Sequence, residues 1–202
     1  MLALISQRQI KSQYNTDCDQ LEKEYIIFFE KFGLELRPVS NFQNADLGNA
    51  GLLILTGGGS IHKEQPQRDN VEKKLFEQAR EKSVPIIGIC RGMQYINLLM
   101  GGNIHENAEL KHPRPNRTDH VITLLDEEIK VNNFHNDVVF VSDLADNLEV
   151  IGLDMENNTV EAFYSKGVLA VQWHPERAFE DEKSEKYSFN LIKKFIESRG
   201  QI

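Results

Sequence analysis

The sequence predicts an α/β fold: a central, mostly parallel β-sheet with helices on both faces and additional antiparallel strands. Before residue 100, short apolar runs alternate with helical patterns, and this order of elements produces a parallel sheet covered on both faces. After residue 120, apolar runs follow one another with short, turn-rich breaks, which is typical of antiparallel strands. No internal repeat or linker interrupts the chain. We therefore expect residues 1–202 to form a single domain.

The first half of the chain alternates strands and helices. Strands are expected at 2–6, 34–40, 51–59 and 85–90. Helices are expected at 17–33, from a cap at Asp69 or Asn70, and at 91–100. The first of these helices has apolar residues at helical spacing and ends at Gly33. Pro38 favours an edge position for the strand at 34–40, because proline cannot donate to a ladder.

The second half of the chain is expected to consist of strands and one closing helix. The strand-like runs occupy 120–125, 130–135, 137–142, 148–154, 159–165 and 168–174. The closing helix is expected from Lys183 to Ser198, where apolar residues recur at helical spacing. The segment 111–119 is a conspicuous irregular loop with two prolines and four basic side chains.

Composition and charge exclude several classes of protein. The net charge of −8 argues against a general affinity for nucleic acid or for an anionic membrane. No apolar run approaches the roughly 20 residues needed to span a bilayer, and the first residues lack the basic leader of a signal peptide. Cys18 and Cys90 fit neither a disulfide framework nor a zinc motif. We therefore expect a cytoplasmic protein that requires no metal and no other cofactor.

The segment Gly88-Ile-Cys90-Arg-Gly92 has the pattern of a nucleophile elbow, with cysteine in place of serine. It lies where a predicted strand ends and a predicted helix begins. Flanking glycines permit the tight turn that exposes a nucleophile, and the positive end of the helix dipole favours negative charge on the sulfur. The plainer alternative is that Cys90 is a buried, small apolar residue at the end of a strand.

A cysteine nucleophile needs a base and an oxyanion site, and the sequence offers both at the ends of other strands. His174 and Glu176 follow a late strand and lie two residues apart, so on extended backbone their side chains point the same way. The glycines at 57–59 follow an earlier strand and can present backbone N–H groups to an oxyanion. Taken singly, these signals also fit a surface ion pair and a flexible turn.

In combination, the glycine-rich strand end, the G-x-C-x-G elbow and the late His-Pro-Glu resemble the class I glutamine amidotransferases over nearly the whole chain. The resemblance implies that family's fold. It implies that Cys90 is the nucleophile, His174 the general acid and base, and Glu176 the carboxylate that orients it. It further implies oxyanion donors from the backbone of Gly58 and Arg91. The resemblance places Gln94 where the family holds the glutamyl part of its substrate, and Gly57 and Gly59 are also expected to bind the substrate.

Finer features resemble the γ-glutamyl hydrolase branch of this family. These features are Arg91 after the nucleophile and the continuation Gly-Gly-Asn-Ile at 101–104. The segment TDHVI at 118–122 resembles the branch's His-x-Val strand, and VNNFH at 131–135 resembles another of its segments, with Asn133 in place of the usual serine. The resemblance implies hydrolysis of a small-molecule γ-glutamyl amide through a glutamyl thioester, releasing glutamate. A narrower likeness, to bacterial hydrolases of γ-glutamyl-CDP-amidate in capsule biosynthesis, implies a nucleotide leaving group.

Two further residues are expected to line the substrate pocket. His135 follows a strand, although a structural hydrogen bond would explain it equally well. Arg117 in the basic loop is a natural clamp for a phosphate, as are Arg114, Arg8 and Lys11. The remaining histidines and Cys18 have plainer structural explanations.

Two functional alternatives remain open from the sequence. One is a glutaminase subunit that delivers ammonia to a separate synthase. The other is a binding protein that keeps the fold without catalysis. Arg91 and the VNNFH segment favour the free-standing hydrolase, for which no obligate synthase partner is expected.

Overall fold

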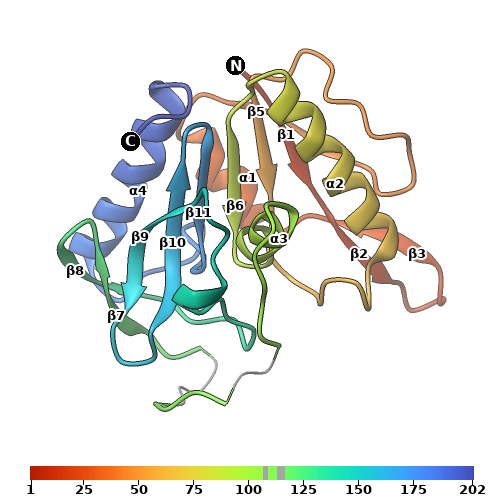
Figure 1. Ribbon diagram of the computed structural model, residues 1–202. Helices are drawn as coiled ribbons and strands as arrows, with labels where there is room; N and C mark the ends of the chain where they lie inside the picture. The colour runs from red at the N-terminus through yellow and green to blue at the C-terminus, as the bar shows by residue number, and fades with distance from the viewer. Residues whose placement is uncertain (107–108, 113–116) are drawn as a thin grey trace.

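A nine-stranded mixed sheet is the centre of the computed structural model, which describes residues 1–106, 109–112 and 117–202 (Figure 1). Its strands are β1 (Leu2–Ser6), β4 (Glu35–Val39), β5 (Leu52–Leu55), β6 (Ile86–Ile89), β7 (His120–Leu124), β8 (Glu127–Val131), β9 (Glu149–Asp154), β10 (Thr159–Ser165) and β11 (Val168–Val171). Their spatial order is β4-β1-β5-β6-β11-β10-β9-β7-β8. A separate two-stranded ribbon pairs β2 (Arg8–Lys11) with β3 (Asp17–Gln20).

The sheet has a parallel half and an antiparallel half. The five strands from β4 to β11 run parallel to their neighbours, whereas β11, β10, β9, β7 and β8 pair antiparallel in turn. The predicted α/β class is therefore confirmed, with the added antiparallel strands continuing the same sheet. The predicted edge position of the proline-containing strand is also confirmed, because β4 forms one edge.

Helices cover both faces of the sheet (Figure 1). On one face, α1 (Lys23–Glu30) and α4 (Glu182–Glu197) share a core with alternate strand residues such as Ile54. On the other face, α2 (Pro66–Glu81) and α3 (Arg91–Leu99) pack on the intervening residues such as Leu53. The central strands are apolar at every position because both of their faces are covered.

Two of the predicted helix starts are wrong. The helix expected over 17–33 is shorter, since Asp17–Gln20 pairs with β2 as a strand and only Lys23–Glu30 is helical. The second helix begins at Pro66, ahead of the predicted cap at Asp69 or Asn70. Proline suits a first helical turn because it has no N–H to leave unpaired.

Two of the predicted strands in the second half are also wrong. The run 130–135 leaves the sheet after Val131, and its remaining residues form a loop. The run 137–142 forms no strand; it makes isolated bridges at Val138 and Phe140 and then a 3₁₀ turn over Val141–Asp143. Apolar residues predicted both strands, but Val138 and Val139 are buried here without belonging to a β-strand. Within the described residues, no helix is long and apolar enough to cross a membrane.

Candidate active site

Cys90 occupies a tight turn between β6 and α3. Its φ of 53° and ψ of −109° lie in a region that non-glycine residues rarely adopt. A Cβ at position 92 would lie 2.1 Å from the Leu55 carbonyl oxygen, and one at position 88 would lie 2.6 Å from the Cδ1 atom of Ile96. The turn therefore requires Gly88 and Gly92, as the elbow pattern predicts.

His174 and Glu176 lie beside this turn, just after β11. The Nδ1 atom of His174 is 2.5 Å from Oε1 of Glu176, and both side chains are buried. The backbone of His174 is held by Asn132, which donates to the His174 carbonyl and accepts from the His174 N–H, each at 2.9 Å. No role was predicted for Asn132, although it stands in the VNNFH segment. These contacts fix the direction of the imidazole ring.

The charge on His174 depends on its two neighbours. Burial alone would lower the pKa of His174. Cys90 opposes this through its negative charge and a hydrogen bond, and Glu176 does so through a hydrogen bond and its negative charge, so the pKa of His174 is raised to about 9. A Cβ on Gly57 would be 2.7 Å from the Cε1 atom of His174 and 3.3 Å from the Cβ of Cys90. The absence of a side chain at Gly57 therefore lets the cysteine and the histidine approach each other.

The glycine-rich turn after β5 borders Cys90. Gly58 and Gly59 have φ values of 87° and 80°, which glycine adopts without strain. The Gly57 N–H donates to the hydroxyl of Tyr25 at 3.0 Å. In the described part of the chain, the N–H groups of Gly58 and Arg91 donate to no other group. They are the two backbone donors that the sequence predicts for an oxyanion.

A pocket of about 370 Å³ opens over these groups. It is lined by Arg8, Glu22, Tyr25, Gly57, Gly58, Gly59, Ser60, Cys90, Arg91, Gln94, Arg117, Phe134, His135, Asn136, Asp137, His174 and Arg177. All predicted catalytic, oxyanion and substrate-binding residues except Glu176 thus line one pocket. Glu176 lies behind His174 and reaches the pocket only through it.

The predicted binding residues offer different groups to this pocket. Gln94 donates from its amide nitrogen to the Asp137 carbonyl and to Gln172, so its carbonyl oxygen is the group available to a substrate. His135 has its Nδ1 3.1 Å from the same Asp137 carbonyl, and burial lowers the pKa of His135. Arg117 is exposed at the rim, with its N–H bonded to the Asn133 carbonyl.

Other candidates from the sequence lie elsewhere. His62 and His105 are largely exposed, and Lys11 pairs with Asp17 on the surface. His120 is buried 3.6 Å from Glu161, and Cys18 lies half-buried on β3. Arg114 is outside the described residues. Among the described residues, no group of three or more His, Cys, Asp or Glu side chains is arranged to hold a metal ion.

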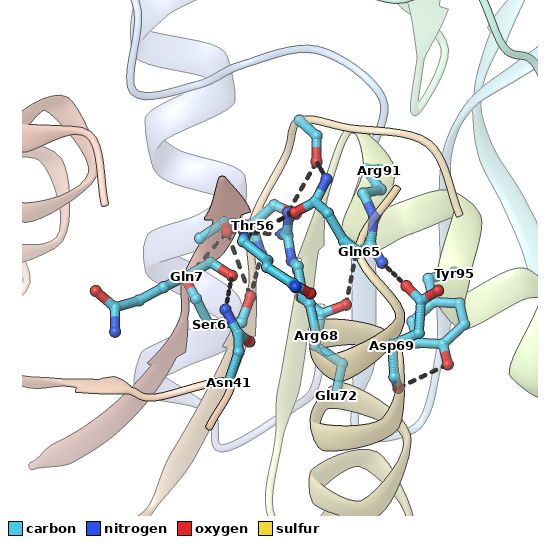
Figure 2. A network of polar contacts seen from close by, with 12 residues as sticks. Ser6, Gln7, Asn41, Thr56, Gln65, Arg68, Asp69, Glu72, Arg91 and Tyr95 are labelled. Carbon is cyan, nitrogen blue, oxygen red and sulfur yellow. Dashed lines mark hydrogen bonds and ion pairs between the residues drawn. The ribbon is translucent and has the colours of Figure 1, made fainter. Parts of the chain in front are cut away.

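A buried charged cluster beneath the glycine-rich turn was not predicted (Figure 2). Arg68 on α2 pairs with Glu72, and Glu72 and Asp69 both pair with the guanidinium of Arg91. All four side chains are almost fully shielded from solvent. The signal in the sequence was the presence of charged residues on the same helix stripe as Val71 and Leu75, the face that packs on the sheet.

The fold and site define a glutamine amidotransferase-like protein, and the chain belongs to the Peptidase C26 family, whose model matches residues 58–176. One relative, the glutamine amidotransferase-like protein YvdE of Lactococcus lactis, is 32% identical over 84% of this chain and 86% of its own length. The gamma-glutamyl-CDP-amidate hydrolase of Campylobacter jejuni is 31% identical over 62% of each chain. The crystal structure of a glutamine amidotransferase from Thermotoga maritima superposes with a TM-score of 0.71 over 100% of this chain and 99% of that chain, at 16% identity, so this likeness concerns the fold.

Proposed function

We propose that this protein is a free-standing cysteine hydrolase that cleaves the γ-glutamyl amide bond of an anionic conjugate and releases glutamate. The observation that carries the proposal is the convergence of Cys90, His174 and the backbone N–H groups of Gly58 and Arg91 on one pocket. A nucleophile, a proton carrier and an oxyanion site are the parts that acyl transfer requires.

The first step forms the thioester. The sulfur of Cys90 attacks the γ-carbonyl carbon, and the carbonyl π electrons move to the oxygen, which the N–H groups of Gly58 and Arg91 stabilise. His174 enters this step protonated, because Cys90 and Glu176 hold its pKa near 9. Collapse of the intermediate re-forms the carbonyl and breaks the C–N bond while His174 donates its proton to the departing nitrogen.

The second step returns the enzyme to its starting state. In the thioester the sulfur of Cys90 carries no charge, so the largest contribution that raised the pKa of His174 is gone. The neutral imidazole can then take a proton from water. The hydroxide attacks the thioester carbonyl, the C–S bond breaks, and glutamate leaves. The same histidine thus acts as acid and then as base.

The pocket favours a leaving group with negative charge. Arg8, Arg117 and Arg177 line it in addition to the groups named above. Glu22 is 3.5 Å from Arg8 and 3.1 Å from Arg177, and Arg177 is also 3.9 Å from Glu176. The three arginines face two carboxylates of the lining, Glu22 and Asp137, so positive charge remains uncompensated. The arginine fork matches phosphate geometry. A phosphoryl or nucleotide amidate, the substrate class for which the Campylobacter relative is named, fits this lining.

The test is glutamate release by the purified chain alone. The substrates would be L-glutamine, neutral γ-glutamyl amides and γ-glutamyl conjugates carrying a phosphate or a nucleotide. We expect an anionic conjugate to be hydrolysed with a kcat/KM well above that of glutamine. Activity that is seen only after a cell extract is added would contradict a free-standing hydrolase and support coupling to a synthase. Preference for neutral amides would contradict the anionic leaving group.

A further inference from the structure

The guanidinium of Arg68 holds the glycine-rich turn by its carbonyl oxygens (Figure 2). One terminal nitrogen, Nη2, donates to the Thr56 carbonyl at 2.6 Å and to the Thr56 hydroxyl at 3.0 Å. The other, Nη1, donates to the carbonyls of Gly57 at 3.2 Å and Gly58 at 2.8 Å. The Nε atom donates to Glu72 at 2.8 Å. One buried side chain therefore contacts three consecutive peptide groups.

These contacts determine where the Gly58 N–H points. A trans peptide is planar, and its C=O and N–H groups point in opposite directions. The Gly57 carbonyl and the Gly58 N–H belong to the same peptide plane. Because Arg68 binds that carbonyl from beneath, the N–H is turned away from Arg68, on the side of the turn that lines the pocket. Gln65 adds a second donor to the Gly58 carbonyl, at 3.1 Å.

The same cluster also holds the second oxyanion donor. The side chain of Arg91 turns away from the pocket into ion pairs with Glu72 and Asp69 on α2. The Cys90 carbonyl, in the peptide that carries the Arg91 N–H, accepts from the Gln94 N–H at 3.1 Å. Burial raises the pKa of Glu72, but the charges of Arg68 and Arg91 lower it. The net effect is a lowered pKa, so the Glu72 carboxylate stays charged. Glu72 thus links the two arginines that hold the two halves of the site.

We propose that Arg68 is a positioning residue: together with Glu72 it sets the direction and spacing of the Gly58 and Arg91 N–H groups, and so prepares the oxyanion site before substrate binds. The inference rests on the proposed hydrolase function. Helix α2 contributes no group to the chemistry. In this proposal it nevertheless stabilises the transition state of acylation, because its side chains position the two N–H donors. Preorganised donors of this kind stabilise charge that develops only during the reaction.

The test compares two reactions of Cys90 in Arg68→Lys. Lysine keeps the positive charge beside Glu72 but lacks the fork that contacts three peptides. The first reaction is hydrolysis of L-γ-glutamyl-p-nitroanilide, or of the fastest substrate from the panel, which needs the oxyanion site. The second is alkylation by iodoacetamide, which displaces iodide at a methylene carbon and forms no oxyanion. Arg80→Lys, on the exposed side of the same helix, is the matched control.

We expect Arg68→Lys to lower kcat by about 10- to 100-fold, with KM and the rate of Cys90 alkylation changed less than about threefold, because a displaced donor costs less than a deleted one. An unchanged kcat, or an equal loss in both reactions, would overturn the inference. Gln65→Leu removes one donor to the Gly58 carbonyl and should lower kcat by a smaller factor, again with little change in the alkylation rate. If Arg68→Lys does not fold, this second variant tests the inference by the same two measurements. A wild-type chain that hydrolyses no substrate would refute the proposed function instead.

Discussion

The parallel and antiparallel halves of the sheet contribute differently to the candidate site. Strands β5, β6 and β11 of the parallel half end at one edge, and the residues that follow them are the glycine-rich turn, Cys90 and His174. The antiparallel half contributes loops: the segment after β8 supplies Asn132 and Phe134, and the segment before β7 supplies Arg117. The groups that we propose to react therefore come from parallel strand ends, and part of their support and of the pocket rim comes from the antiparallel half.

The largest effect is expected from the nucleophile in the parallel half. Cys90→Ala removes the sulfur that forms the thioester, so turnover should fall by at least about 10⁴-fold. Glutamate release measured over hours checks this, and circular dichroism checks that the fold is retained. Cys18→Ala is the matched control, because Cys18 lies on the β2–β3 ribbon away from the pocket. Substantial turnover in Cys90→Ala would place the chemistry elsewhere.

The next effect is expected from Glu176, also in the parallel half. Glu176→Gln keeps an acceptor near His174 but removes the charge that helps to raise the pKa of His174 to about 9. Since acylation uses the protonated imidazole, kcat/KM should fall as pH rises through this pKa. In the variant, kcat/KM should fall by about 10²-fold and the alkaline limb should move to lower pH. A pH profile between about 6 and 10 tests this. An alkaline limb at the same pH in both proteins would contradict it.

A smaller effect should come from the antiparallel side through Asn132. Asn132→Ala removes both hydrogen bonds to the His174 backbone, and a slightly misplaced imidazole should lower kcat by about tenfold with little change in KM. Steady-state kinetics measure this. The control is Asn157→Ala, which removes a buried asparagine bonded to His112 and Asp154. An equal loss of kcat in the control would show a general effect of destabilisation.

The smallest effect should come from Arg117 at the rim. Arg117→Ala removes one exposed positive charge, so KM for a phosphate-bearing conjugate should rise about fivefold while KM for a neutral amide stays the same. Added salt should weaken binding of the anionic substrate in the same direction. Arg37→Ala, on the exposed edge strand β4, removes the same charge away from the pocket. Equal KM values in wild type and Arg117→Ala would exclude Arg117 from leaving-group binding.

The sequence predicted the parallel half better than the antiparallel half, and the reason is physical. A Cβ on Gly88 would lie within 3 Å of residues 92–96, and a Cβ on Gly92 would lie within 3 Å of Leu55 on the neighbouring strand. The need for both glycines therefore arises close to the turn itself, and the G-x-C-x-G pattern is enough to predict it. The run 130–135 belongs to β8 only as far as Val131. It then forms a loop in which Asn132 hydrogen-bonds to the His174 backbone, a contact with a segment far away in the chain. Pairing of Asp17–Gln20 with β2 likewise depends on a distant segment that competes with the helical pattern.

The buried charges of α2 show a second limit. Arg68 and Glu72 are four residues apart, a spacing that is common for exposed ion pairs on helices. Their burial follows from the way α2 packs beneath the glycine-rich turn, which no local pattern records. A charged pair on the apolar stripe of a helix was the available signal. It pointed to these residues, but their partners at Thr56, Gly57 and Gly58 come from another strand end.

The most direct test of the thioester mechanism is to trap the acyl enzyme. The purified chain would be mixed with excess γ-glutamyl conjugate, quenched in acid within milliseconds to seconds, digested and examined by mass spectrometry. We predict a glutamyl thioester on the peptide that contains Cys90, and none on the peptide that contains Cys18. In Glu176→Gln, His174 is a weaker base for deacylation, so the thioester should last longer than in the wild type. Release of glutamate without any adduct on Cys90 would contradict the mechanism.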